Sequence, residues 1–123
     1  MKVVNPTVGA ILADTARKFP DKTAIICDDK TVTYRELDSR VNQRAHGFLQ
    51  RGIAGKKRVA VLLSNSIELV EVYFALARLG CVTIPLNYRL SGRELSFILD
   101  NAEPAALIMG EEYSSLVHEL KDP

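Results

Sequence analysis

The sequence predicts an α/β fold of three layers, in which helices flank a mostly parallel sheet and a β-hairpin lies near the amino terminus. Three observations lead to this prediction. Short apolar runs rich in β-branched residues alternate with longer segments whose apolar residues recur at helical spacing. The run at 59–63 is apolar throughout, as in a parallel strand that is covered on both faces. Finally, a chain of 123 residues is long enough for one domain with a single core.

Composition and charge are those of an ordinary globular protein. Hydrophobic residues make up 47% of the chain, and 16 basic residues stand against 15 acidic ones, for a formal net charge of +1. This balance gives no indication of nucleic-acid binding. No segment reaches the roughly 18 uncharged apolar residues of a membrane span, and residues 1–6 do not begin like a signal peptide. We therefore expect a cytoplasmic protein that has no membrane span and binds no nucleic acid.

Neither the cysteines nor the histidines form a pattern that indicates a catalytic or metal site. Cys27 and Cys81 each lie in an apolar run without CxxC spacing, so we expect small buried side chains and no metal ligands or disulfide. His46 and His118 are expected on helices, and no Ser, His and Asp constellation is visible. The sequence therefore predicts no metal ligand and no catalytic residue.

Two elements are expected before residue 34. Asn5 followed by Pro6 is a good helix start, because Asn caps free amides and Pro is tolerated at the first helical position. This helix would end before Pro20. Its expected apolar stripe consists of Val8, Ile11, Leu12, Thr15 and Phe19. The β-rich runs 23–27 and 31–33 are separated by three polar residues, which predicts a hairpin.

Three helices are expected to begin at capping boxes, in which one side chain caps the helix and a Glu three residues later reaches back to it. The pairs are Thr33 with Glu36, Asn65 with Glu68, and Ser91 with Glu94. The first helix should span 34–51, because Gly52 supplies the left-handed residue on which helices often end. The third should end near Asn101. A strand at 105–109 and a helix at 111–120 are expected to follow.

The segment 59–87 predicts a strand, a helix and a second strand at 81–84, joined as a parallel crossover. The helix carries only a narrow polar stripe, formed by Glu68, Glu71 and Arg78. A helix that is apolar nearly all round is buried on more than one side. We therefore expect a second layer against this helix, either from this chain or from a part of the protein outside it.

The loop of Asn87, Tyr88 and Arg89 is the best candidate for a binding site. It follows the carboxyl end of a predicted parallel strand, where open α/β sheets bind ligands. It also offers an aromatic ring beside a guanidinium, which suits planar and anionic groups. A surface crossover loop without a ligand is the alternative interpretation.

Two stretches resemble core motifs of the adenylate-forming superfamily, which includes acyl-CoA synthetases, aryl-CoA ligases, luciferases and peptide-synthetase adenylation domains. VTYREL at 32–37 looks like the first motif, and ALARLGCVTIPLN at 75–87 looks like the second. The stretches LLSNSIELVEVYFA and RLSGRELSFILDNAEPAALI are also similar to bacterial acyl-CoA synthetases. The resemblance covers nearly the whole chain.

This resemblance implies an enzyme that uses ATP and Mg²⁺ to form an acyl-adenylate from a carboxylate, and then transfers the acyl group to coenzyme A. Members of the superfamily are several times longer, so residues 1–123 would be an amino-terminal portion of the large domain. The rest of the parent enzyme would be the partner of this portion. The chain has no counterpart of the superfamily's Gly-rich phosphate loop or catalytic Lys. By analogy, Tyr88 and Arg89 would lie near the nucleotide end of coenzyme A.

Two functional hypotheses follow. In the first, the chain is a structural fragment of an ATP-dependent acyl-CoA synthetase, inactive alone and without a cofactor of its own. In the second, it is a stand-alone α/β module for interaction or dimerisation. Self-association through exposed apolar surface would support the second hypothesis.

Overall fold

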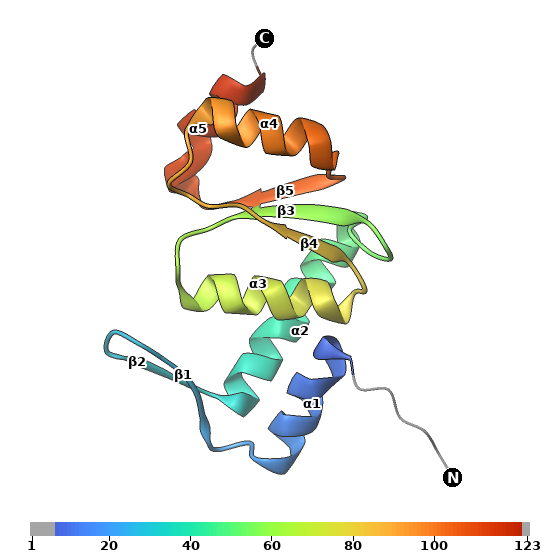
Figure 1. Ribbon diagram of the computed structural model, residues 1–123. Coiled ribbons are helices and arrows are strands. Elements are labelled where there is room, and N and C mark those ends of the chain that lie inside the picture. The colour runs from blue at the N-terminus through green and yellow to red at the C-terminus, as the bar shows by residue number, and fades with distance from the viewer. Residues whose placement is uncertain (1–6, 122–123) are drawn as a thin grey trace.

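The computed structural model describes residues 7–121, and helices alternate with strands along this range (Figure 1). The amino-terminal elements are α1 (Val8–Lys18), β1 (Thr23–Cys27), β2 (Lys30–Thr33) and α2 (Tyr34–Gln50). The central elements are β3 (Arg58–Leu62), α3 (Ile67–Arg78) and β4 (Val82–Pro85). The last elements are α4 (Gly92–Ala102), β5 (Ala106–Met109), the 3-10 helix η1 (Glu111–Tyr113) and α5 (Ser114–Lys121). This alternation confirms the predicted α/β class.

Within residues 7–121, β3 lies at the centre of a three-stranded parallel sheet with the order β4, β3, β5. Val59 of β3 pairs with Thr83 on one side and with Ala106 on the other. β1 and β2 form a separate antiparallel hairpin, and Asp28 adopts a left-handed conformation (φ 55°) in its turn. The predicted parallel strands and the predicted hairpin are both confirmed.

Several element boundaries differ from the predicted ones by a residue. The strands expected at 81–84 and 105–109 are Val82–Pro85 and Ala106–Met109, and the helix expected at 111–120 is divided into η1 and α5. Pro85 follows the strand predicted at 81–84, but in the structure it is the last residue of β4 and pairs with Val61. Proline is tolerated there because β4 is an edge strand.

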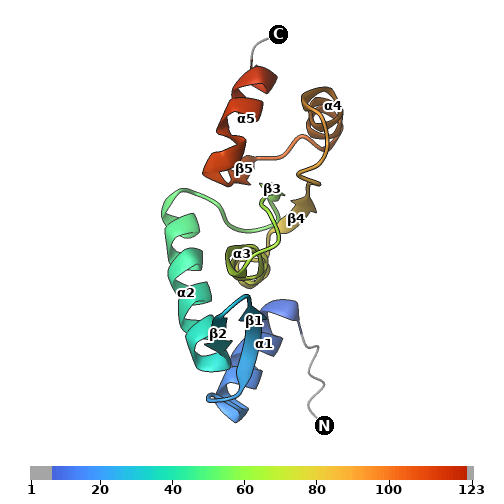
Figure 2. The same ribbon diagram turned by 90° about the vertical axis from the view of Figure 1, so that its left-hand side faces the viewer.

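The helices lie in layers on both sides of the sheet (Figures 1 and 2). α4 and α5 cover one face and α3 covers the other, while α1, the hairpin and much of α2 lie on the far side of α3. Val72 and Leu76 of α3 pack with Val59 and Val61 of β3. On its opposite side, Ala75 belongs to a cluster with residues of α1, α2 and the hairpin. α3 is therefore buried on two sides by this chain itself, which identifies the expected second layer.

Helix α1 packs through small side chains, and the predicted stripe of large ones is mostly wrong. The buried residues of α1 are Gly9, Leu12 and Ala16. The exposed members of the predicted stripe are Val8, Ile11 and Phe19. A small residue is needed at Gly9 because α1 and α3 approach closely there: a Cβ added to Gly9 would lie 2.9 Å from Arg78 Cα.

The described start of α1 is capped by Thr7. Its Oγ1 accepts a hydrogen bond from the Ala10 amide at 3.2 Å, as a threonine cap does. Asn5 and Pro6, the predicted helix start, lie outside the described residues.

Replacing Gly9 with Ala is expected to lower the free energy of unfolding by about 1–3 kcal/mol, because overpacking would force the backbones of α1 and α3 apart. Gly47→Ala is the matched control. A Cβ at Gly47, in the last turn of α2, meets nothing within 4 Å. Ala there should therefore raise the free energy of unfolding by up to about 1 kcal/mol. Urea denaturation followed by circular dichroism measures both changes. A Gly9→Ala protein as stable as the wild type would show that α1 is not held this close to α3.

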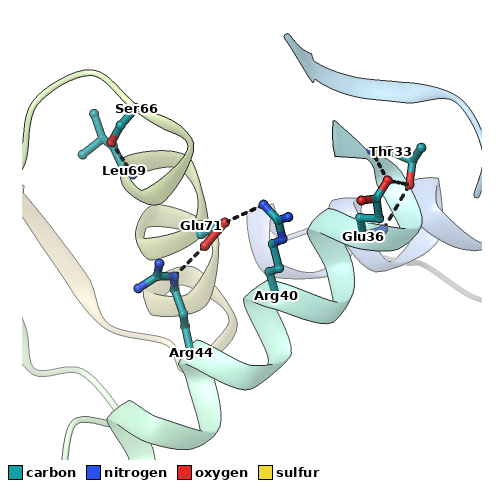
Figure 3. Close-up of polar contacts among 7 residues, drawn as sticks. All are labelled: Thr33, Glu36, Arg40, Arg44, Ser66, Leu69 and Glu71. Atoms are coloured by element: carbon teal, nitrogen blue, oxygen red, sulfur yellow. Dashed lines mark hydrogen bonds and ion pairs between the residues drawn. The ribbon is translucent and has the colours of Figure 1, made fainter. Parts of the chain in front are cut away.

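Two of the three predicted capping boxes are present. Thr33 Oγ1 accepts a hydrogen bond from the Glu36 amide, and the Glu36 carboxylate accepts one from the Thr33 amide, each at 3.2 Å (Figure 3). The bond from the Thr33 amide, followed by the bond from its hydroxyl, lowers the pKa of Glu36. Ser91 and Glu94 form the same arrangement at the start of α4. Sequence spacing identifies both boxes because the partners are only three residues apart.

The third predicted box, Asn65 with Glu68, is wrong by one residue. Ser66 caps α3, and its Oγ accepts a hydrogen bond from the Leu69 amide at 3.2 Å (Figure 3). Glu68 is then the second helical residue, whereas a capping box needs its Glu at the third. Asn65 remains outside the helix and lines a cleft at the carboxyl ends of β3 and β4.

Candidate functional site

An open cleft of about 340 Å³ lies at the carboxyl ends of β3 and β4. The segment after β3 and the loop after β4 both contribute to it. The lining residues are Leu63, Asn65, Leu69, Tyr73, Leu86, Asn87, Tyr88 and Arg89. The structure therefore brings all three residues of the predicted loop, Asn87 to Arg89, to a hollow at the edge of the sheet where α/β proteins bind ligands.

The loop after β4 begins as a hydrogen-bonded turn. Leu86 is 7% exposed, and its amide donates to Val61 O at 2.9 Å, which continues the pairing with β3. Asn87 Oδ1 accepts a hydrogen bond from the Arg89 amide at 2.9 Å. The backbone is thus held on both sides of Tyr88, so that the side chains of Tyr88 and Arg89 project from a defined turn.

Tyr88 and Arg89 combine an aromatic ring with a positive charge on the wall of the cleft. Arg89 Cζ lies 5.6 Å from the centroid of the Tyr88 ring, within the range of a cation–π contact. Within residues 7–121, Arg89 forms no salt bridge. Its guanidinium is therefore available to an anionic group, beside a ring on which a planar group can stack.

A second tyrosine, Tyr113 of η1, packs against Tyr88. The two ring centroids are 6.4 Å apart, and the ring planes are inclined by 40°. Burial raises the pKa of Tyr113, as do the nearby Glu112 and Tyr88, while a hydrogen bond with the Ser64 side chain acts in the opposite direction. Ser64 follows β3, Tyr88 follows β4 and Tyr113 follows β5. The segments that leave all three parallel strands therefore meet at the tyrosine pair.

Sequence reasoning missed this pairing. The predicted helix at 111–120 includes Tyr113 without a partner for it, whereas in the structure Tyr113 lies in η1 and packs on the core between the sheet and α4. The available signal is its position, since Tyr113 follows a parallel strand as Tyr88 does. The segments that follow parallel strands all begin at the same edge of the sheet, so aromatic residues in these segments can contact one another.

The residues of the cleft suit binding better than proton transfer. Its lining contains two tyrosines, two asparagines and an arginine among apolar side chains, with no His, Cys, Asp or Glu. His46 and His118 are exposed elsewhere on the surface. In the described range of 7–121, no three or more His, Cys, Asp or Glu side chains form a group that could hold a metal ion. The helices of that range are too short or too polar to cross a membrane.

A buried carboxylate fixes α3 against α2, outside the cleft (Figure 3). Glu71 is 4% exposed. Arg44 Nε donates to its Oε1 at 2.7 Å, and Arg40 Nη1 lies 3.6 Å from its Oε2. Glu71 belongs to the narrow polar stripe that the sequence predicts for this helix, and it can be buried there because two arginines reach it from α2. Leu69 and Tyr73, two residues before and after Glu71, line the cleft.

Another ion pair joins the same two helices. Arg78 Nη2 donates to Asp38 Oδ1 at 2.8 Å, and Arg78 Nη1 donates to Asn42 Oδ1 at 2.6 Å. The two groups lie at the middle and the end of α3 and so oppose its rotation about its own axis. We infer that they help to keep Leu69 and Tyr73 directed at the cleft.

Comparisons with known proteins agree with the resemblance in the sequence. The model of the family described as AMP-binding enzyme matches residues 12–122. The chain is 40% identical over 108 residues to the 2,3-dihydroxybenzoate-AMP ligase of Bacillus subtilis, covering 88% of this chain and 20% of that protein. It is 35% identical over 98 residues to the 3-oxocholest-4-en-26-oate–CoA ligase of Rhodococcus rhodochrous, covering 80% of this chain and 18% of that protein.

Among solved structures, the chain is similar to the N-terminal domain of FACL13 from Mycobacterium tuberculosis, with a TM-score of 0.90 and 29% identity. The likeness covers 97% of this chain and 30% of that one. The chain thus spans about a fifth of the curated relatives cited here and corresponds to part of a domain in the solved structure. On the match over residues 12–122, the chain belongs to the AMP-binding enzyme family.

Proposed function

We propose that this chain is the amino-terminal scaffold of an ATP-dependent, cytoplasmic acyl-CoA synthetase. The intact parent would convert a carboxylate, ATP and coenzyme A to acyl-CoA, AMP and pyrophosphate, with Mg²⁺ as cofactor. In this proposal, residues 1–123 are an amino-terminal portion of its large domain and are inactive alone. The rest of the parent is the partner that completes the site.

The observation that carries the proposal is the family match over residues 12–122 together with the fold of the N-terminal domain of FACL13. The relatives named above are ligases that act through AMP or coenzyme A according to their names. We identify no side chain of this chain as a catalytic acid, base or nucleophile. A role as scaffold is therefore the one that its residues support best.

Tyr88 and Arg89 are proposed to contact the nucleotide end of coenzyme A in the intact enzyme. The chemistry of the two side chains fits such a ligand, because a guanidinium pairs with phosphate oxygens and a tyrosine ring stacks on a planar base. The amides of Asn65 and Asn87 add donors and acceptors on the same cleft. This chain supplies only part of the contact, so we expect it to bind such a nucleotide weakly.

The isolated chain is expected to show no saturable binding of ATP in the presence of Mg²⁺ and no release of pyrophosphate. The physical reason is the absence from its sequence of a Gly-rich phosphate loop. Isothermal titration calorimetry up to millimolar ATP measures the binding, and a coupled pyrophosphate assay with a panel of carboxylates measures turnover. Saturable ATP binding by the folded chain would contradict the proposal that the nucleotide site lies elsewhere.

The alternative function is a stand-alone module for interaction or dimerisation. Such a module would associate through surplus apolar surface on its central helix, α3. That helix is covered by the sheet on one side and by α1 and α2 on the other. The large apolar residues that remain exposed include Ile26 at 75% and Phe97 at 71%. They lie on the hairpin and on α4, and we propose that the rest of the parent enzyme covers them.

A further inference from the structure

We propose that Tyr113 is a positioning residue for the cleft, which holds the Tyr88 ring and thereby fixes the turn that presents Tyr88 and Arg89 to a nucleotide. This inference rests on the function proposed for Tyr88 and Arg89 and adds a residue that does not itself line the cleft. Its effect would pass through the contact between the two rings.

The geometry of the tyrosine pair is that of a favourable aromatic contact. The 6.4 Å between the centroids lies within the range of about 4.5–7 Å in which aromatic pairs attract, and a tilted arrangement is preferred over a parallel sandwich. Tyr88 is 36% exposed and projects from a turn outside the sheet. Among residues 7–121, this contact is the aromatic pair that the structure shows for it.

Tyr113 is attached to the core, so in this contact Tyr113 restrains Tyr88 and not the reverse. Its amide donates to Gly110 O at 3.0 Å, and the Gly110 amide donates to Leu62 O of β3 at 3.1 Å. Tyr113 also packs on the cluster that contains Leu95 and Val117, which are 0% and 9% exposed. By contrast, the side chains after Leu86 in the turn are exposed. Tyr113, which packs on the core, therefore restrains the more exposed side chain of Tyr88.

The ring of Tyr113, more than its hydroxyl, should carry this role. The contact that the structure shows between Tyr113 and Tyr88 joins their two rings. Tyr113→Phe keeps the ring contact and removes only the hydroxyl. Tyr113→Leu keeps an apolar side chain for the core and removes the aromatic contact. The two variants therefore separate positioning of Tyr88 from packing and from hydrogen bonding.

Nuclear magnetic resonance on the 123-residue chain tests the proposal. In the wild type, nuclear Overhauser effects between the rings of Tyr88 and Tyr113 are expected, and their absence would overturn it without any variant. In Tyr113→Leu, the backbone order parameters of residues 87–90 should fall from about 0.85 toward 0.6 or below. Tyr113→Phe should keep the wild-type values. Phe97→Leu, which removes an exposed ring on α4, is the matched control and should change nothing in the turn.

Unchanged order of the turn in a folded Tyr113→Leu chain would overturn the proposal. Titration with adenosine 3′,5′-bisphosphate, which represents the nucleotide end of coenzyme A, separately tests the function on which it rests. In the wild type we expect weak shifts at the amides of Tyr88 and Arg89, and at least fivefold weaker binding in Tyr113→Leu. If the turn is ordered but the titration shifts no amide, the nucleotide role alone is contradicted. If the wild type and Tyr113→Leu bind the nucleotide with equal affinity, the positioning role is overturned.

Discussion

Replacing Arg44 with Met is expected to lower the free energy of unfolding by about 2–3 kcal/mol, because it leaves a buried carboxylate without its closest partner. The side chain of Glu71 is 5% exposed, and after the change only Arg40 at 3.6 Å would remain beside it. The value lies slightly below the 3–5 kcal/mol or so of a fully buried pair because Arg44 itself is 36% exposed. Chemical denaturation in urea measures the loss.

A control with the same chemistry on the surface separates burial from charge. Arg17 pairs with Asp14 at 2.8 Å, nearly the distance of the Arg44 pair, but the two side chains are 74% and 56% exposed. Exposed pairs contribute little, so Arg17→Met should stay within about 0.5 kcal/mol of the wild type. Equal losses in Arg17→Met and Arg44→Met would mean that Glu71 is hydrated in solution and that its burial does not matter.

Truncating Leu76 to Ala is expected to cost about 2–5 kcal/mol, the range found when a buried Leu leaves a cavity. Leu76 is 0% exposed and packs between α3 and the central strand, with Val59, Val61 and Val72 in the same cluster. Leu49→Ala on α2 makes the same chemical change at a side chain that is 51% exposed. It should remain within about 0.5 kcal/mol of the wild type.

Thermal and urea unfolding of both leucine variants, followed by circular dichroism, measure this difference. A loss for Leu76→Ala no larger than that for Leu49→Ala would show that α3 is not packed against the sheet as the structure has it. A large loss at both positions would instead point to an unrecognised partner for the outer face of α2.

The sequence predicts those parts of the fold that depend on neighbours along the chain. The boxes of Thr33 with Glu36 and of Ser91 with Glu94 are confirmed because each joins residues three apart. The apolar run at 59–63 gives the central strand because burial on both faces leaves no polar alternation. Asn65 is misplaced because Ser66 is an equally good cap one residue later.

Contacts between distant segments account for what the sequence does not predict. Glu71 meets Arg44, 27 residues earlier in the chain, and helical spacing carries no information about which helices lie together. Gly9 looks unfavourable for a helix until the close backbone of Arg78 is known. The candidate site is likewise predicted only in part. Tyr88 and Arg89 can be located from the sequence because ligands bind at the carboxyl ends of parallel strands. The fold is needed to bring Asn65 and Tyr73 to the cleft and Tyr113 behind it.

The central place of β3 has a consequence for the order in which the protein folds during synthesis. Both of its neighbours are made after it, since β4 ends at Pro85 and β5 at Met109. During synthesis, β3 can therefore pair with β4 only after residue 85 has emerged from the ribosome, and with β5 only after residue 109 has emerged. The layer of α1, the hairpin and α2 also packs on α3, so it too is completed only after residue 78, the end of α3, has been made.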